Sequence, residues 1–189
     1  HNNTRTPMTK PLPPVRRIET GTNAEGRSYI EQDGESPAVL TFPARPGYRN
    51  TNIWRTLGPD APVDAPDTIA EHRGVLPPKG GTVLRVIDIP PESKDPEERR
   101  AQTAAVFAAM FPDATRHEES LDRHPGMHMT DTVDYAILLQ GELVAIMDEG
   151  ETVMKAGDIL IQRGTNHAWA NRSDSIARIA FVLVDGKRR

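Results

Sequence analysis

The C-terminal third of the chain is a series of short apolar segments, and this series restricts the possible folds more than any other feature. The segments read VDYAILLQG, ELVAIMDEG, ETVMKAG, DILIQRG, HAWANRS and IARIAFVLVDG, and Gly, Asp, Asn or Ser bounds each of them. Short strands at this spacing are typical of an antiparallel sandwich or barrel. No repeat of fixed period accompanies them, which argues against solenoids and propellers. We therefore expect an all-β fold here.

The composition of the whole chain also favours turn-rich β structure, because 17 prolines and 14 glycines separate many short apolar runs. Residues 16–21 and 27–34 resemble a hairpin around a turn at 23–26, and further strands are expected around Ile53 and at 82–90. We expect residues 82–189 to form the barrel, and residues 8–81 to be an N-terminal extension that packs on it or is exchanged with a second subunit. Residues 1–7 have the character of a tag or processing remnant.

One helix is expected near 96–111. Asp95 can cap its N-terminus, Pro96 suits the first helical position, and Glu98 stands where a capping-box carboxylate would reach back. Alanines favour the helix until Pro112 ends it. Its apolar residues predict a packing role.

Composition excludes several kinds of function. The chain has 189 residues, a formal charge of −4 with mixed signs, and no cysteine. We therefore expect no nucleic-acid partner, no disulfide and no thiolate ligand. No apolar run is long enough to span a membrane and no leader is visible, so we expect a cytoplasmic protein without a membrane partner. Any metal site must use His, Asp or Glu.

The stretch HPGMHMTDTVDYAILLQG, residues 124–141, carries the main chemical signal. Residues of equal parity share one face of a strand, which places His128 with Thr130, and Asp134 among apolar neighbours with Tyr135 on the opposite face. A carboxylate in an apolar strand is costly unless it is paired, hydrogen-bonded or bound to a cation. For Asp134 the alternatives are a cation, nearby backbone amides, and an ion pair with Arg163 or Arg178.

A second segment, GDILIQRGTNHAWAN, offers a partner for this stretch. His167 follows a turn at 164–166 that could bring it into a barrel mouth. If two strands bring His128, Asp134 and His167 together, two imidazoles and a carboxylate suit a divalent Fe, Mn, Ni or Zn ion with open positions for water or substrate.

These two segments resemble the paired motifs of the cupin superfamily. Asp134 and Gly141 keep the six-residue interval of the first motif, His128 stands at its first histidine and Thr130 at its second. The second motif is matched by Gly157, by residues 162–164 in place of the Pro-x-Gly turn, by His167 and by Asn171. The resemblance covers residues 123–185, and more loosely 82–90. It implies a jelly-roll β-barrel, here with extra N-terminal strands and the one helix.

The resemblance also implies roles for single residues. Thr130 removes one of the four family ligands, leaving His128, Asp134 and His167 as a three-ligand metal site, and Thr130 could instead hold Asp134 by a hydrogen bond. His124 is a candidate proton shuttle, with a supporting role or a solvated loop position as alternatives. Arg163 could bind a substrate carboxylate or form a surface ion pair. Trp169 could line the substrate pocket or pack in the core.

Together these features predict a metal-dependent small-molecule enzyme. The family implies a lyase, isomerase or dioxygenase that acts on an oxygenated organic acid or a phenolic compound. The alternative is a non-catalytic cupin that binds or senses a small ligand at a decayed metal site. Because an open sandwich leaves edge strands to cover, we also expect a homodimer.

Overall fold

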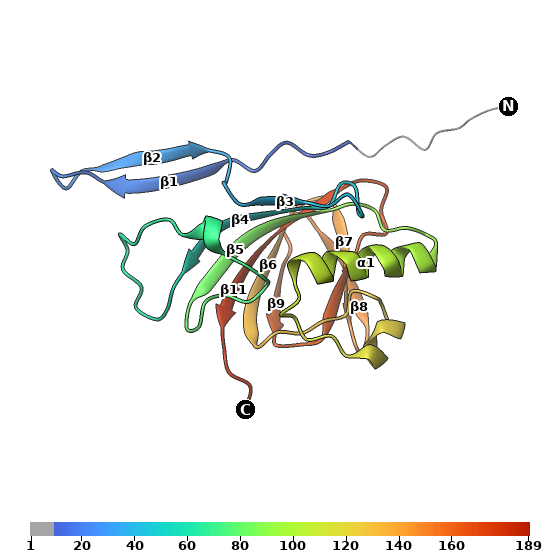
Figure 1. Ribbon diagram of the computed structural model, residues 1–189. Helices are drawn as coiled ribbons and strands as arrows, with labels where there is room; N and C mark the ends of the chain where they lie inside the picture. Colours follow the sequence, from blue (N-terminus) through green and yellow to red (C-terminus); the bar gives the residue numbers. More distant parts are fainter. Residues whose placement is uncertain (1–9) are drawn as a thin grey trace.

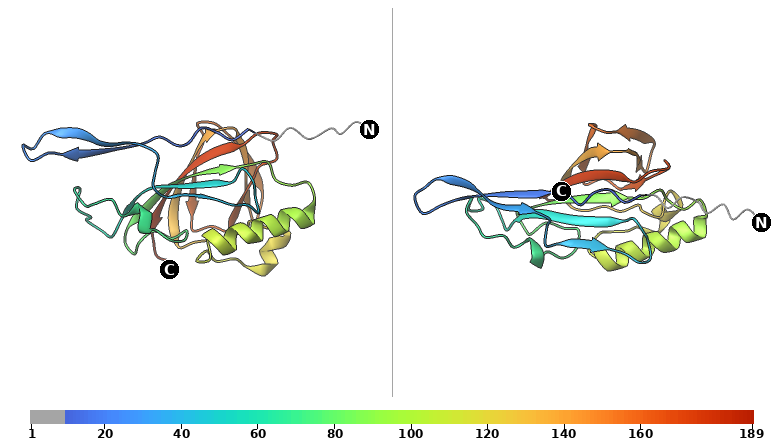
Figure 2. Two further views of the ribbon diagram at one scale, coloured as in Figure 1. Left: turned by 45° about the horizontal axis from the view of Figure 1, so that its top comes forward. Right: turned by 90° about the horizontal axis from the view of Figure 1, so that it is seen from above.

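The protein is built around two β-sheets that face each other (Figures 1 and 2). The computed structural model describes residues 10–189, so the remnant expected at 1–7 lies outside the described residues. The larger sheet has six strands in the order β3-β4-β5-β11-β6-β9, and the smaller has three in the order β10-β7-β8. All named strand pairs are antiparallel. The predicted β fold of jelly-roll type is confirmed.

The elements follow the expected pattern of strands and turns. In chain order they are β1 (Arg17–Thr22), β2 (Ser28–Gly34), β3 (Val39–Thr41), β4 (Arg49–Thr56), a 3₁₀ turn (Ile69–Glu71), β5 (Thr82–Ile89), α1 (Pro96–Met110), a second 3₁₀ turn (Glu118–Asp122), β6 (Thr132–Gln140), β7 (Glu142–Met147), β8 (Glu151–Lys155), β9 (Ile159–Arg163), β10 (His167–Ala170) and β11 (Ala177–Asp185).

Strand β6 shows how the alternation of the sequence creates the interior. Thr132, Asp134, Ala136 and Leu138 point inward and are buried, whereas Tyr135 is exposed on the outer face, as predicted. Inward residues of β5, β7 and β11 complete the core between the sheets. The face of β6 that carries Asp134 is therefore the inner face of the barrel.

The N-terminal residues extend the larger sheet and add a projecting hairpin. Strand β4 hydrogen-bonds to β5 along its length, so the sheet continues across the boundary expected at residues 81 and 82. The predicted hairpin forms from β1 and β2, closed by a turn in which the Asn23 side chain accepts two backbone N–H bonds. It projects from the body of the molecule (Figures 1 and 2).

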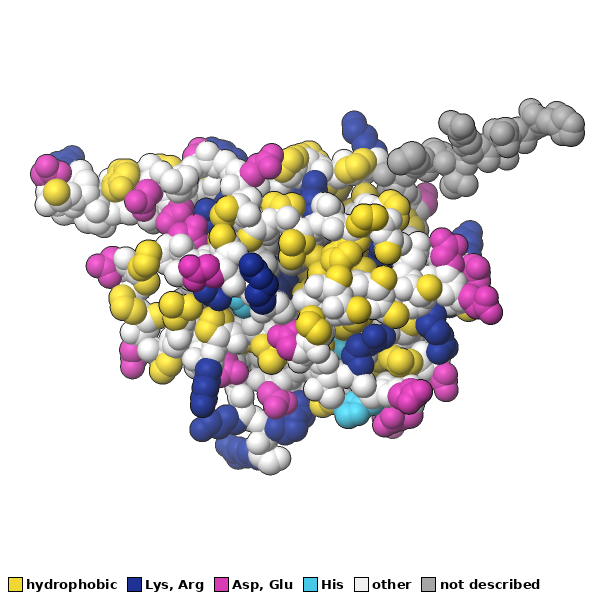
Figure 3. Space-filling model, viewed as in Figure 1, with side chains coloured by type: hydrophobic (Ala, Val, Ile, Leu, Met, Phe, Trp, Pro, Cys, Tyr) yellow, Lys and Arg dark blue, Asp and Glu magenta, His cyan; other side chains and the backbone are white. Residues whose placement is uncertain are grey.

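Helix α1 begins as predicted, because the Asp95 side chain accepts the Glu97 N–H at 3.1 Å. The capping box is wrong, since Glu98 accepts instead from the Ser93 hydroxyl. On the face shown in Figure 3, hydrophobic side chains gather between this helix and the strands above it. Within residues 10–189 no helix is long and apolar enough to cross a membrane.

Candidate functional site

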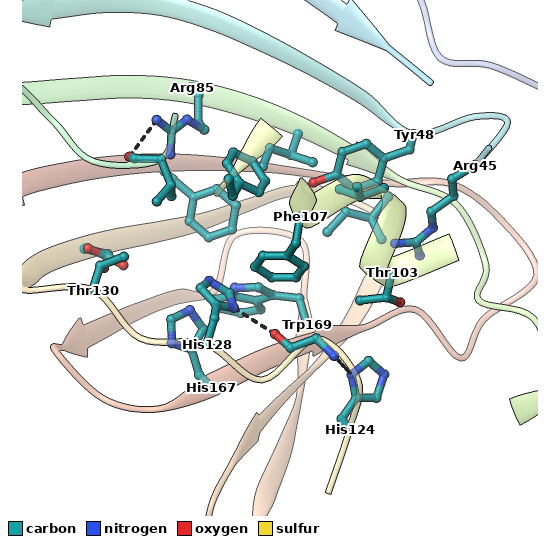
Figure 4. A pocket seen from close by; sticks show the side chains of 18 of the residues that line it. Arg45, Tyr48, Arg85, Thr103, Phe107, His124, His128, Thr130, His167 and Trp169 are labelled. Atoms are coloured by element: carbon teal, nitrogen blue, oxygen red, sulfur yellow. Dashed lines mark hydrogen bonds between the residues drawn. The ribbon is translucent and has the colours of Figure 1, made fainter. Parts of the chain in front are cut away.

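A pocket lies in the barrel interior between the two sheets and α1 (Figure 4). The space that a water-sized molecule can occupy in it is about 90 Å³, within about 830 Å³ of empty volume that includes open solvent at the mouth. Inner faces of β5, β6, β10 and β11 line it, together with α1 and the loop that carries His124 and His128. The helix is therefore a wall of the pocket, which the expected packing role did not include.

His128 and His167 lie side by side in this pocket. Their backbones exchange two N–H···O bonds of 2.9 Å, and their ring centroids are 4.3 Å apart. The turn before His167 depends on Gly164, whose φ of 65° favours glycine. The backbone pairing of the loop with β10 thus sets the two imidazoles against each other.

Hydrogen bonds define the tautomer of both imidazoles. Each Nδ1 lies 2.8 Å from a backbone carbonyl, that of Gly126 for His128 and that of Thr165 for His167. A carbonyl only accepts, so each Nδ1 carries the proton and each neutral ring keeps a lone pair on Nε2. Neither Nε2 has a hydrogen-bond partner among the described residues.

Burial keeps both rings neutral. Desolvation lowers the pKa of His128 to about 4 and that of His167 to about 3, with the neighbouring imidazole as a second cause for His167. At neutral pH the pocket therefore contains two unprotonated Nε2 atoms, each on a ring oriented by a backbone carbonyl.

Asp134 lies on the same pocket but is held by a threonine relay. The Thr132 hydroxyl donates to Asp134 Oδ1 at 2.5 Å, and the hydroxyls of Thr130 and Thr132 lie 2.6 Å apart. Thr130 thus contacts Asp134 only through Thr132, which corrects the predicted direct bond. The ion pair considered with Arg178 is wrong, because Arg178 binds Asp88 at 2.7 Å.

Desolvation raises the pKa of Asp134 to about 6, although the bond from Thr132 and the charge of Arg85 both act to lower it. Asp134 is only 5% exposed. Its ionised form is therefore costly in this structure, as expected for a buried carboxylate without a cation in contact.

The structure brings together two of the three predicted metal ligands. Across residues 10–189 no group of three His, Asp or Glu side chains is close enough to hold a metal ion. His128 and His167 fit a metal, since a ligating imidazole commonly donates its other N–H to a carbonyl or carboxylate. Asp134 does not complete the set in this arrangement, because its carboxylate is not close enough to the two imidazoles to share an ion with them.

His124 lies on the pocket wall with both ring nitrogens in use. Its Nδ1 accepts the Gly126 N–H at 3.0 Å, and its Nε2 lies 2.8 Å from Glu92 Oε2. This geometry anchors the loop that carries His128. The predicted proton shuttle would first have to break one of these bonds, so the structure favours the supporting role.

Arg163 lies outside the pocket. It is exposed at the end of β9, and Gln162 takes the inward position beside Asp134. Strand alternation turns its side chain to the outer face, so the substrate contact predicted for Arg163 has no support from the barrel pocket.

Thr130 and Trp169 both line the pocket, where they were placed as substrate-pocket residues. The Trp169 ring lies 5.7 Å from the His167 ring and 5.4 Å from the Phe181 ring, measured between centroids. It forms part of an aromatic wall next to the paired histidines.

Several lining residues were not predicted from the sequence, among them Tyr48, Arg85 and Phe107. Arg85 did carry a signal, because it shares the inward parity of Val83 and Ile87 on an otherwise apolar face of the strand. Tyr48 and Phe107 carried none, since the loop before β4 and the helix reach the pocket only through tertiary packing.

The family model of the cupin domain matches residues 116–184. The cupin-domain-containing oxidoreductase fogC of Aspergillus ruber is 34% identical over 90% of this chain and 72% of its own length. Phomopsin biosynthesis cluster protein D of Diaporthe leptostromiformis is 34% identical over 57% of this chain, and the match spans only 42% of that relative. A cupin 2 conserved barrel domain protein from Salinispora arenicola aligns with a TM-score of 0.39 and 13% identity, over 77% of this chain and 82% of its own. The chain belongs to the cupin superfamily.

Proposed function

We propose that this protein is a cupin-type oxidoreductase that acts on a small organic molecule inside the barrel pocket, with His128 and His167 as ligands of a divalent metal. One observation carries the proposal. Two buried neutral imidazoles line one pocket, and each has an Nε2 lone pair without a partner among the described residues.

The imidazoles are prepared for ligation. Their Nδ1–H bonds to Gly126 and Thr165 fix the ring orientation and raise the basicity of the opposite nitrogen. Metal binding requires unprotonated ligands, and the low pKa of both histidines removes competition from protons at neutral pH.

The rest of the pocket positions a substrate and excludes water. Phe107 packs against the His128 ring at 5.0 Å, and Trp169 and Phe181 continue the apolar wall. A bound Fe, Mn, Ni or Zn ion would supply Lewis-acid or redox chemistry to an oxygen-bearing substrate. Such an organic acid or phenol would lie against these aromatic rings.

We favour an oxidoreductase, such as a dioxygenase, over the lyase or isomerase that the family also allows, because fogC is named an oxidoreductase and aligns along most of this chain. Fold alone does not decide among cupin reactions.

A non-catalytic cupin that binds or senses a small ligand is the second candidate. Thr130 occupies the position of a family ligand, and Asp134 is bonded to Thr132. Because no group of three such donors is assembled in residues 10–189, the site would then be a remnant that keeps its pocket.

Metal content separates the two candidates. Elemental analysis of protein purified without chelator should find about one metal ion per chain, and His128→Ala or His167→Ala should lower occupancy at least about tenfold. His117→Ala is the matched control, because His117 is exposed and outside the pocket. Less than about a tenth of an ion per chain, with no gain on adding Fe(II), Mn(II), Ni(II) or Zn(II), would leave the non-catalytic candidate.

The partners and location stay predictions. We expect a homodimer, a cytoplasmic location, and no nucleic-acid or membrane partner. The exposed apolar outer faces of β6 and β9 are the surface we expect a second copy to cover.

A further inference from the structure

Arg85 is a buried cation without a carboxylate in contact. It lies on β5 in the middle of the larger sheet, is 1% exposed, and lines the pocket (Figure 4). No Asp or Glu of residues 10–189 lies within ion-pair distance of its guanidinium. A buried charge without a partner costs several kcal/mol, so natural proteins rarely keep one.

Three other arginines with little exposed surface have carboxylate partners, whereas Arg45 and Arg116 bind backbone carbonyls. Arg17 binds Asp67 at 2.7 Å, and Arg49 and Arg178 both bind Asp88 at 2.7 Å. Arg85 has no such partner, and at 1% exposed it is the most buried arginine of residues 10–189.

The hydrogen bonds of Arg85 leave part of the guanidinium free. Nη2 donates to the carbonyls of Val75 at 2.8 Å and Gly74 at 3.3 Å, and Nε lies 3.5 Å from Asn52 Oδ1. Nη1 donates to no described residue, and it is not fully enclosed by protein atoms. Although burial lowers the pKa of Arg85 to about 10, the group stays charged at neutral pH.

Tyr48 adds a second polar group to the wall of this pocket, and the guanidinium of Arg45 lies over its ring at 5.3 Å. It precedes β4, is 6% exposed, and its hydroxyl makes no hydrogen bond to any described residue. Figure 4 shows its hydroxyl directed into the pocket, on the same side as Arg85 and across from His128 and His167. Burial raises its pKa to about 12, so it is a neutral O–H donor.

We propose that Arg85 and Tyr48 form a carboxylate-binding subsite, and that the pocket takes an organic acid whose carboxylate binds there while its apolar body extends toward His128 and His167. The substrate class rests on the proposed function, whereas the binding itself needs no metal. Phe107, Phe111 and Phe181 provide the apolar surface between the two ends.

The charge of the pocket favours a carboxylate over a phosphate. One guanidinium and one hydroxyl match the two oxygens of a monoanion. Asp134 and Glu92 line the same pocket, and their negative charge would oppose a dianion. A second arginine on the wall, Arg45, donates to the Pro90 carbonyl.

Matched acids and amides test the subsite. Benzoate, phenylacetate and cinnamate are titrated into the full chain after chelator treatment, and each is compared with its neutral amide by calorimetry. Each acid that binds should bind at least about tenfold more tightly than its amide. Arg85→Met should remove this preference and leave amide binding unchanged, while Arg163→Met, at the exposed position on β9, should keep it. Equal binding of acid and amide, or no acid binding up to about 10 mM, would overturn the proposal.

Two further variants keep the test decisive. Tyr48→Phe retains the ring packing and should weaken acid binding about three- to tenfold. If Arg85→Met does not fold, Tyr48→Phe serves as the test in its place. Unchanged acid binding in Tyr48→Phe would then count against the subsite. The His128→Ala/His167→Ala double variant should keep the acid preference. If the preference is lost there but kept in Arg85→Met, the carboxylate binds at the histidines, which overturns this subsite and leaves the proposed metal function standing.

Discussion

Replacing Asp134 with asparagine should stabilise the protein at alkaline pH and change its stability little in acid. Asp134 is 5% exposed, and its side chain accepts a hydrogen bond from the Thr132 hydroxyl. Its pKa is raised from 3.8 to about 6 by burial, which corresponds to about 3 kcal/mol.

The sign of this effect follows from proton binding. Because the folded state holds the proton more tightly than the unfolded chain, the ionised carboxylate lowers stability fully above about pH 6. The cost shrinks as pH falls through that value and vanishes below the ordinary pKa of 3.8. Asparagine cannot ionise, so Asp134→Asn should raise the free energy of unfolding by about 1 to 3 kcal/mol at pH 8 and by less than about 0.5 kcal/mol at pH 4. The lower end of this range allows for the cost of burying the asparagine amide N–H group without a hydrogen-bond partner.

Urea denaturation of chelator-treated protein at pH 8 and pH 4 measures the effect. Asp131→Asn is the control, because Asp131 pairs with Arg188 and is largely exposed; its change should stay within about 0.5 kcal/mol at both values. If Asp134→Asn destabilises the protein at pH 8 by more than about 1 kcal/mol, the carboxylate is compensated by a cation and the reasoning on its burial is wrong.

Three other predictions concern stability and assembly. In the folded protein His128 has a pKa of about 4 and His167 a pKa of about 3, both below the ordinary 6.5. The stability that these neutral rings contribute to the fold is therefore complete above pH 6.5 and is lost as pH falls through the folded pKa values. Unfolding of the chelator-treated protein should therefore become easier below pH 6.5, and a His128→Gln/His167→Gln variant that declines as steeply as the parent would contradict this. Asp95→Ala should cost about 1 kcal/mol in urea denaturation, because it removes the cap on the Glu97 N–H; no loss would show that the cap is dispensable. Light scattering should give twice the chain mass, and Ile161→Asp on the exposed outer face of β9 should give monomers; a parent protein that is already monomeric would refute the proposed dimer.

The strands could be predicted from the sequence because their signal is local. Alternation along β6 placed Asp134 inside and Tyr135 outside, and both placements are confirmed. The same rule put Arg85 with its apolar neighbours in β5, although its link to the pocket was not recognised. It also places Arg163 outside once Gln162 is known to face inward.

The site was harder to predict because its contacts join distant segments. His124 is bound to Glu92, which lies 32 positions away, and no local pattern announces that pair. Whether Asp134 comes close enough to His128 and His167 to share a metal depends on side-chain geometry that spacing alone does not contain. Helix α1 was expected from its cap and alanines, but its place as a pocket wall follows from the packing of Phe107 against His128.

The central claim, that His128 and His167 ligate a metal in the barrel pocket, is tested most directly by X-ray absorption spectroscopy of the metal-loaded protein. Imidazole ligands are recognised there by scattering from the outer ring atoms. The account predicts about two imidazoles per metal ion, with oxygen donors in the remaining positions, and loss of the imidazole signal in the His128→Ala/His167→Ala variant. An unchanged spectrum in that variant, or a bound metal without imidazole ligands, would contradict it.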